Sequence, residues 1–177
     1  MRLKGLVYRA HNPRWSFAPT SGDGAALHGG RFNPKGTPAL YTSLRPETAW
    51  LEAQQAFPFK PQPLTLCAYD VDCADVANLT DAEERARLNV TLGDLACPWE
   101  LLASQGEEPP SWHLARRLMA EGIAGIIVES FAPGAGQAAG FPHRNAIFWR
   151  WSGRPPHRVT IIDDFGRLPR DGMSWRQ

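Results

Sequence analysis

The chain has 177 residues, of which 43% are hydrophobic and 21% are charged, a composition typical of one folded domain. Nineteen lysines and arginines against eighteen acidic residues leave a net charge of +1, which argues against a protein that binds nucleic acid or a membrane surface by charge. No apolar stretch reaches about 18 residues and no secretory leader is evident, so the sequence predicts no membrane-spanning helix.

The N-terminal half is predicted to alternate short elements with long turns. We expect a strand over residues 3–8, a long loop over 12–38, a strand over 39–42, a helix over 46–57 and a strand over 64–71. The helix has a favourable start, because Pro46 lacks the N–H that a first turn leaves unbonded and Glu47 lies at the positive helix end. The long loop is rich in glycine, proline, serine and asparagine, and ordered loops of this length are usually functional.

The C-terminal half is predicted to contain more helix. A Thr80-x-x-Glu83 pattern is typical of a capping box and opens a helix through residue 89. Ser111 is predicted to cap a second helix, which ends at residue 121 before Gly122. We further expect a short helix over residues 98–105, strands over 125–129, 145–151 and 158–163, a second glycine- and proline-rich loop over 131–142, and a loosely held tail after 164.

This order of elements indicates the fold class. Roughly five or six strands and three or four helices follow one another irregularly, which favours an α+β fold with a mixed or antiparallel sheet over a doubly wound parallel sheet. We expect a single domain over residues 1–177, with its core over about 6–163. The sequence contains no G-x-G-x-x-G after a strand and no Walker loop, so Rossmann and P-loop sites are not supported.

Residues 29–43 carry the most informative motif, Gly-Gly-Arg-Phe-Asn-Pro-Lys-Gly-Thr-Pro-Ala-Leu-Tyr-Thr-Ser. Two glycines allow a sharp turn before Arg31, and residues 33–36 are typical of a second turn. We therefore expect Arg31 to be held beside the strand of Tyr41. A guanidinium in a fixed place can bind a phosphate or carboxylate through two parallel hydrogen bonds, and a tyrosine ring offers a surface for stacking.

The helix that follows adds one carboxylate. Glu52 shares a face with Ala49, Ala53 and Ala56, since residues three and four apart are neighbours on a helix. Glu47 is turned about 140° away from Glu52, so the two glutamates are not expected to serve one site. Taken singly, Arg31 can also be a loop-bracing arginine, Tyr41 an ordinary strand aromatic and Glu52 a solvated helix residue.

In combination these motifs resemble a known family. The order Tyr8-Arg9, then the motif of residues 29–43, then Glu-Thr-Ala-x-x-Glu over 47–52 is similar to the RES-domain family, toxins of bacterial toxin–antitoxin modules named after an arginine, a glutamate and a serine. The resemblance extends from residue 6 to about 151. On the family's pattern Arg31 matches the arginine, Glu52 the glutamate and Ser130 the serine. Tyr41 matches a further tyrosine of the pattern, and Asn145 matches a polar position at the start of the late strand.

The resemblance implies a fold and a substrate. RES proteins are similar in fold to ADP-ribosyltransferases of the diphtheria-toxin type, and they consume NAD without a metal. Glu52 would stabilise positive charge on the ribose, Arg31 would hold a phosphate, and Tyr41 would stack on nicotinamide. Ser130 would donate a hydrogen bond to the nicotinamide or the ribose. Arg9 and Asn145 are added as NAD-binding residues.

The expected activity follows from the same resemblance. We expect a toxin that transfers ADP-ribose to a protein acceptor, such as a host protein. An NAD glycohydrolase or phosphorylase that depletes cellular NAD is the alternative. The expected partner is an antitoxin protein with a helix-turn-helix region, so that any DNA contact belongs to the partner and the toxin itself stays cytoplasmic. The resemblance leaves the acceptor and the stoichiometry open.

From the residues alone, functions of other classes, such as a non-catalytic protein-interaction module, remain open. Seven tryptophans, with Trp149 and Trp151 at alternate strand positions, could form a protein-binding face or belong to the core. The five histidines include no i, i+4 pair. His143 is interpreted as a solvated loop residue, with a place in the site beside Ser130, together with Arg144, as the alternative. Asp163-Asp164 is interpreted as a strand end that meets solvent. The three cysteines form no C-x-x-C pair, which disfavours disulfides and zinc and favours a reducing compartment.

Overall fold

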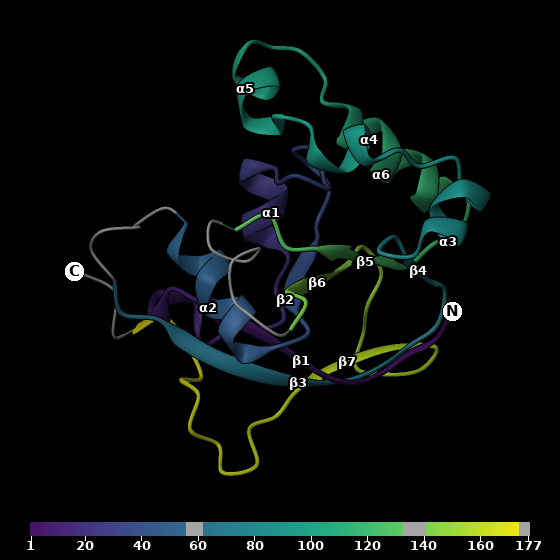
Figure 1. Cartoon of the computed structure of the whole chain (residues 1–177). Coiled ribbons are helices and arrows are strands. Elements are labelled where there is room, and N and C mark those ends of the chain that lie inside the picture. Colours follow the sequence, from purple (N-terminus) through teal and green to yellow (C-terminus); the bar gives the residue numbers. More distant parts are fainter. Residues whose placement is uncertain (56–61, 133–140, 174–177) are drawn as a thin grey trace.

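The computed structural model describes residues 1–55, 62–132 and 141–173. Over these residues the chain forms a seven-stranded sheet with short helices around it (Figure 1), in the strand order β4-β5-β6-β2-β1-β3-β7. The strands are β1 (Leu3–His11), β2 (Leu40–Ser43), β3 (Thr65–Cys73), β4 (Val76–Asn78), β5 (Gly125–Glu129), β6 (Arg144–Phe148) and β7 (His157–Ile161). The helices are η1 (Pro13–Trp15), α1 (Asp23–His28), α2 (Pro46–Gln54), α3 (Ala82–Arg87), α4 (Leu92–Ala96), α5 (Trp99–Ser104) and α6 (Pro110–Ala120).

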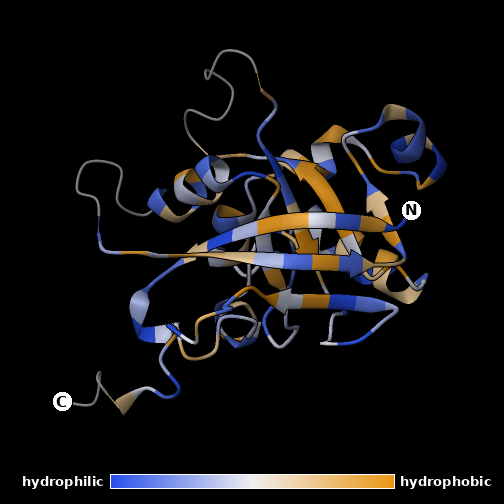
Figure 2. Cartoon of the chain, turned by 90° about the horizontal axis from the view of Figure 1, so that it is seen from below, coloured by the Kyte–Doolittle hydropathy of each residue, from blue (hydrophilic) through white to orange (hydrophobic). Residues whose placement is uncertain are grey.

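The sheet is mixed, which confirms the predicted α+β class. Its β4–β5 pair is parallel, whereas the other neighbouring strands run antiparallel. The longest pairing joins β1 to β3 over nine residues of each strand, and this explains why β1 continues to His11, beyond the strand end expected from the sequence. Figure 2 shows β1, β3 and β7 side by side from below, where no helix of the described part of the chain covers their outer face.

Both faces of the sheet carry apolar side chains. Helices α3 to α6 lie between β4 and β5 in the chain and gather on one side of the sheet (Figure 1), where Leu118 of α6 packs against Ile126 of β5 in one core cluster. A second cluster includes Tyr69 of β3 and Phe148 of β6, both fully buried. Burial at this level supplies roughly 1.5–3 kcal/mol per large side chain, so the two clusters fix the sheet that carries the site.

Several local predictions were wrong, each for a physical reason. Thr80 does not cap α3, because its hydroxyl donates to Asn78 Oδ1 (2.8 Å) within a turn, and Asp81 caps instead by accepting from the Glu84 N–H (2.9 Å). Ser111 does not cap α6 either. It is fully buried within the helix, and its hydroxyl oxygen accepts from Cys97 Sγ.

Short elements were missed. The predicted loop over residues 12–38 contains η1 and α1, and β4 and α4 were not predicted. Helix α4 has a capping box in which Thr91 and Asp94 bond each other's backbone N–H, so the signal was present but supports only five residues. Elements this short depend on tertiary packing rather than on local sequence preference.

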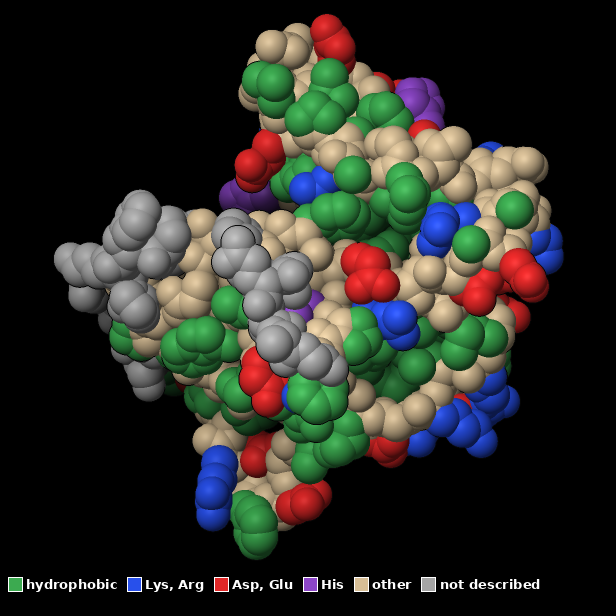
Figure 3. All heavy atoms as spheres, in the orientation of Figure 1, with side chains coloured by type: hydrophobic (Ala, Val, Ile, Leu, Met, Phe, Trp, Pro, Cys, Tyr) green, Lys and Arg blue, Asp and Glu red, His purple; other side chains and the backbone are tan. Residues whose placement is uncertain are grey.

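The surface mixes the two charge signs. On the face shown in Figure 3, lysine and arginine side chains stand beside acidic ones. Several form ion pairs across strands, such as Arg158 with Asp70 (2.6 Å) and Arg2 with Asp72. Within the three described ranges, no helix is long and apolar enough to span a membrane.

Candidate functional site

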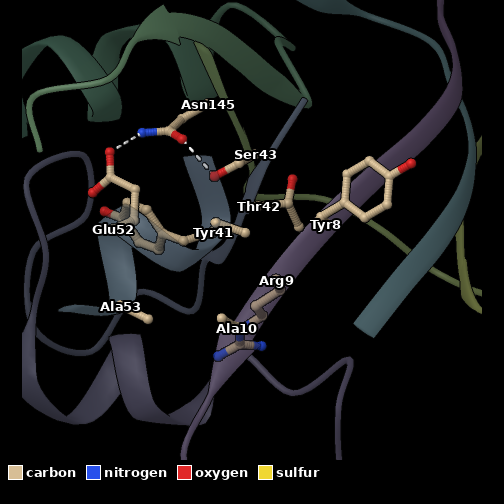
Figure 4. A pocket seen from close by; sticks show the side chains of 10 residues that line it. Tyr8, Arg9, Ala10, Tyr41, Thr42, Ser43, Glu52, Ala53 and Asn145 are labelled. Carbon is tan, nitrogen blue, oxygen red and sulfur yellow. Dashed lines mark hydrogen bonds between the residues drawn. The ribbon is translucent and has the colours of Figure 1, made fainter. Parts of the chain in front are cut away.

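A cleft opens beside α2, where β1, β2 and β6 lie next to one another. It consists of two adjoining cavities, of about 260 Å³ and about 400 Å³, which share Arg9, Tyr41, Glu52 and Asn145 in their walls. The first cavity is shown in Figure 4. Cavities of a few hundred Å³ that combine apolar walls with a few converging polar groups are typical of small-molecule sites.

The turn before Arg31 is built without spare room. Gly29 has a φ of +76°, a conformation that favours glycine. A Cβ on Gly30 would lie 2.6 Å from the Tyr41 hydroxyl oxygen and 2.7 Å from Asn33 Oδ1, so only glycine fits. Trp112 of α6 donates its indole N–H to the Gly30 carbonyl (2.7 Å). The double glycine therefore brings the backbone against Tyr41 and fixes the position of the Arg31 backbone, from which its side chain extends.

Asn33 and Tyr41 lock this turn to β2. The Asn33 side chain is fully buried, and its amide donates to the Ala25 carbonyl (2.8 Å) at α1. Tyr41 donates its hydroxyl proton to Asn33 Oδ1 (2.7 Å) and accepts from the Phe32 N–H (2.9 Å). Burial raises the pKa of Tyr41 well above its usual value. The phenol is thus used internally, and the ring is what Tyr41 offers to the cleft.

Arg31 lies at the mouth of the larger cavity, held by backbone rather than by acids. Its guanidinium donates to the carbonyl oxygens of Cys97 (2.7 Å) and Leu95 (3.4 Å), which lie at the end of α4. The ring of Phe131 covers one face of the guanidinium, with 4.4 Å between the carbon centre and the ring centroid. Partial burial lowers the pKa of Arg31. An arginine guanidinium nevertheless stays protonated in proteins.

Arg9 is fixed in the same manner on β1. It donates to the carbonyl oxygens of Pro19 (3.1 Å) and Ser21 (3.0 Å), and it lines both cavities. Burial lowers the pKa of its guanidinium. In Figure 4 the guanidinium points away from Glu52. The cleft therefore carries a carboxylate and, turned away from it, a positive group.

Side-chain donors hold Glu52. Its Oε1 accepts from the Ser130 hydroxyl (2.6 Å) and from the Asn145 amide, and its Oε2 accepts from Gln55. Ser43 stands opposite Asn145 in the β2–β6 pairing and donates to Asn145 Oδ1 (2.7 Å), which turns the amide N–H toward Glu52 (Figure 4). Residues from four separate segments thus orient one carboxylate.

Comparison with known proteins identifies the family of this chain. The sequence model of the RES domain matches residues 6–171. The chain belongs to the RES-domain family. A chain in the crystal structure of the MbcT–MbcA toxin–antitoxin complex of M. tuberculosis has a similar fold, with a TM-score of 0.58 and 16% sequence identity over 92% of this chain and 84% of that chain. A search of curated proteins gave no significant match.

The structure brings the sequence-predicted residues of the RES domain together. Arg9, Arg31, Tyr41, Glu52 and Asn145 line the cleft, and Ser130 reaches it through its bond to Glu52. The predicted alanine face is also present, with Ala49 and Ala53 beside Glu52, whereas Ala56 lies outside the described residues.

Other residues of the RES-domain cleft were missed. Ser43 belongs to the motif of residues 29–43, but its role depends on the β2–β6 register, which the sequence does not reveal. Phe131, Trp99 and Gln55 line the larger cavity without a sequence signal of their own.

His143 corrects an expectation. It is buried, with 8% of its surface exposed, rather than solvated, and its Nδ1 bonds the Thr48 hydroxyl (2.8 Å).

Two other readings of the sequence can now be assessed. Trp149 belongs to one core cluster and Trp151 packs, partly buried, against the other, and their indole N–H groups donate to the Phe32 and Thr20 carbonyls (2.8 and 3.0 Å), which favours the core interpretation of these two residues. Asp163 accepts from the backbone N–H groups of Arg167 and Leu168 in a turn. Across the described ranges, no three His, Cys, Asp or Glu side chains cluster as metal ligands would, and all three cysteines are buried free thiols.

Proposed function

We propose that this RES domain is an NAD-consuming toxin that breaks the nicotinamide–ribose bond and transfers ADP-ribose to a protein acceptor. The observation that carries the proposal is the Glu52 carboxylate, held by Ser130 and Asn145 in a cleft that Tyr41, Arg9 and Arg31 also line. The arrangement of a fixed acid, an aromatic ring and two fixed cations suits a dinucleotide with one ribose at the acid and its phosphates near the cations.

The chemistry needs few groups. When the bond between the ribose C1′ and the nicotinamide nitrogen breaks, its electron pair leaves with nicotinamide and positive charge develops on the ribose. The Glu52 carboxylate would stabilise that charge, and its hydrogen bonds would hold it in place before the reaction starts. Nicotinamide leaves as a neutral ring, so no general acid is required. The acceptor then bonds to C1′ and releases its proton.

The cations and the aromatic ring would bind and orient the substrate. Arg31 and Arg9 retain N–H groups beyond those bonded to carbonyl oxygens, and these would bind the pyrophosphate. The Tyr41 ring would stack on nicotinamide, while Phe131 keeps the Arg31 guanidinium in place. Orientation of this kind can supply a large part of a rate enhancement.

The acceptor is proposed to be a protein because the segment after β1 exposes apolar side chains beside the cleft. Trp15, Phe17 and Leu27 are 55%, 36% and 70% exposed and suit contact with another protein. The solved relative comes from a toxin–antitoxin complex, and on that likeness we propose a protein antitoxin with a helix-turn-helix region as the partner of this chain. Buried free cysteines suit the cytoplasm, where NAD is available.

The test is nicotinamide release. Purified wild-type protein is incubated with NAD, and free nicotinamide is quantified by chromatography. Glu52→Gln keeps the side-chain volume but removes the charge, and we expect it to lower the rate about 100-fold or more. Glu47→Gln is the matched control, because Glu47 is exposed on the same helix, pairs with Arg45 and lines neither cavity; it should stay within about twofold of wild type. An equally active Glu52→Gln protein, or no release by wild type, would contradict the proposal.

A second experiment identifies the acceptor. NAD labelled in the adenosine part is added with a cell lysate, with water alone, or with phosphate. Label on a protein band supports transfer to protein. Free ADP-ribose indicates a glycohydrolase, and ADP-ribose 1-phosphate indicates a phosphorylase. Growth arrest on expression of the wild-type chain, absent with Glu52→Gln, tests toxicity.

A further inference from the structure

Helix α2 is joined to the residues at the start of β6 at two points one helical turn apart. Glu52 bonds the Asn145 amide, and Thr48 bonds His143 Nδ1 (2.8 Å). Thr48 and Glu52 are four residues apart on one face of α2, and His143 and Asn145 are two residues apart. We call the two bonds the inner rung (Glu52–Asn145) and the outer rung (Thr48–His143).

The repeat distances of the two elements match. Four residues of α-helix advance about 6 Å, and two residues of extended strand advance about 6.6 Å on the same face. A helix laid along an extended segment can therefore make both bonds in one register. Sliding α2 by one residue would break both together, so the outer rung fixes the position that the inner rung needs.

Ser130 closes the arrangement into a ring. Its N–H donates to the His143 carbonyl (2.8 Å), which continues the β5–β6 pairing by one step, and its hydroxyl donates to Glu52 Oε1 (2.6 Å). His143 therefore holds Ser130 through its backbone and Thr48 through its side chain. Both groups that position Glu52, the donor Ser130 and helix α2, are tied to one histidine.

Neither partner of the outer rung touches the cleft. Thr48 is fully buried, His143 is 8% exposed, and neither lines the two cavities. A buried hydroxyl and a buried imidazole are costly to leave without partners, so each depends on the other to stay in place. Their effect on a bound substrate therefore passes through groups that they hold, which include Glu52 and Ser130.

We propose that Thr48 and His143 are positioning residues that set where the Glu52 carboxylate stands in the cleft. The proposal rests on the proposed function for its kinetic readout. A carboxylate moved by a fraction of an ångström binds the substrate almost as before but stabilises developing charge less well. The loss should therefore appear in kcat and not in KM.

The kinetic test compares Thr48→Val with Thr48→Ser. Valine keeps the shape but removes the hydroxyl, and we expect kcat to fall about tenfold while KM for NAD stays within about twofold. Serine keeps the hydroxyl and should restore kcat to within about twofold. Thr65→Val is the matched control, because it removes a hydrogen bond of similar length (2.7 Å, from Ser16) outside both cavities and should leave kcat unchanged.

A second pair of variants tests the same bond by substituting His143. His143→Asn places an amide near the position of Nδ1 and should keep kcat, whereas His143→Gln cannot and should behave like Thr48→Val. This second pair keeps the proposal testable if Thr48→Val does not fold. Equal losses in Thr48→Val and Thr65→Val, or unchanged kcat in both Thr48→Val and His143→Gln, would overturn the positioning role.

A readout without turnover separates this proposal from the function. The carboxyl carbon of Glu52 is followed by NMR in the isotope-labelled protein. We expect its resonance to shift in Thr48→Val and in His143→Gln but not in Thr65→Val. A shifted resonance in a protein that does not consume NAD would support the positioning and contradict the function. An unmoved resonance in both variants would contradict the positioning, whatever the activity.

Discussion

The two charged sides of the cleft are held by different kinds of partner. Glu52 is oriented by the side chains of Ser130, Asn145 and Gln55. Arg31 is oriented by the carbonyl oxygens of Leu95 and Cys97, and Arg9 likewise by two carbonyl oxygens. The hydrogen bonds of the acid therefore depend on which side chains surround it, whereas those of the arginines depend on where the backbone runs, with the Phe131 ring as a further contact of Arg31. Substitution of neighbours should affect the first side far more than the second.

This difference has a physical basis. A carboxylate held by hydroxyl and amide donors loses a bond whenever a donor is truncated, and hydrogen bonds to charged groups contribute about 1.5–3 kcal/mol. A carbonyl oxygen stays in place when its side chain is truncated, provided that the backbone keeps its path. The predictions that follow test this contrast, beginning with the largest effect.

Removal of an arginine side chain should cause the largest loss of activity. Arg31→Ala is expected to lower kcat/KM for NAD about 100-fold or more, because charge-assisted bonds to phosphate are lost. Arg31→Lys keeps the charge but not the planar fork, so it should recover only part of the loss. Arg14→Ala, an exposed arginine that stacks on Trp15 outside both cavities, is the control and should match wild type. Full activity in Arg31→Ala would remove Arg31 from the site.

Truncation of donors on the acid side should give intermediate losses. Asn145→Ala removes one donor from Glu52 and is expected to lower kcat about tenfold. Ser43→Ala leaves Asn145 present but unoriented, and about a threefold loss is expected. The two effects should not add in the double variant, because Ser43 acts through Asn145. Steady-state kinetics on the three proteins checks this order, and a larger effect for Ser43→Ala than for Asn145→Ala would reverse it.

Truncation of a neighbour on the arginine side should be almost silent in activity. Cys97→Ala removes the bond from the thiol to Ser111 Oγ but leaves the carbonyl that holds Arg31. We expect kcat/KM within about twofold of wild type and a loss of about 1 kcal/mol in the free energy of unfolding. Urea denaturation and steady-state kinetics measure both. A loss of activity comparable to that of Asn145→Ala would show that the contrast between the two sides does not hold.

The smallest expected effect is that of the Arg9 charge on the pKa of its neighbour His11. Burial, with a further contribution from Arg9, lowers the pKa of His11 to about 4. In Arg9→Leu we expect the pKa to rise but to stay below the usual 6.5, since burial is the larger cause. An NMR titration of the His11 ring follows it, with Arg14→Leu as the control. An unchanged pKa in Arg9→Leu would mean that His11 does not sense that charge.

The sign of the stability effect follows from the same shift. His11 has a lower pKa in the folded protein than in the unfolded chain, so the unfolded chain takes up the proton first as the pH falls. The free energy of unfolding should therefore decrease between about pH 6.5 and pH 4 on account of His11. Denaturation at several pH values within this window checks it, and the decrease should be smaller in Arg9→Leu.

The sequence located residues on both sides of the cleft but not the partners that hold them. Arg31, Glu52 and Ser130 were matched residue by residue, but Ser130 was expected to bond the substrate and in the structure donates to Glu52. The anchors of Arg31 are backbone atoms at the end of α4, a five-residue helix that the sequence analysis missed, so no residue type could reveal them. The positions of these carbonyl oxygens are known only once the backbone has been traced through the fold.

Strand register and the burial of single side chains were the other features that could not be predicted from the sequence. Ser43 and Asn145 meet because β2 pairs with β6 in one particular register, and His143 is buried because Thr48 lies opposite it. The strand β3 and the turn chemistry of residues 29–36 depend on local sequence, and both were predicted. Contacts between elements far apart in sequence depend on the whole packing, and these include the ring of bonds around Glu52.

The most direct test of the account is a crystal structure of the Glu52→Gln variant with bound NAD. We predict that NAD occupies the cleft between β1, β2 and α2, with the nicotinamide ribose against residue 52, the nicotinamide on the Tyr41 ring and the phosphates within reach of Arg31 or Arg9. A dinucleotide bound outside this cleft, or bound within it with its phosphates at residue 52, would contradict the account.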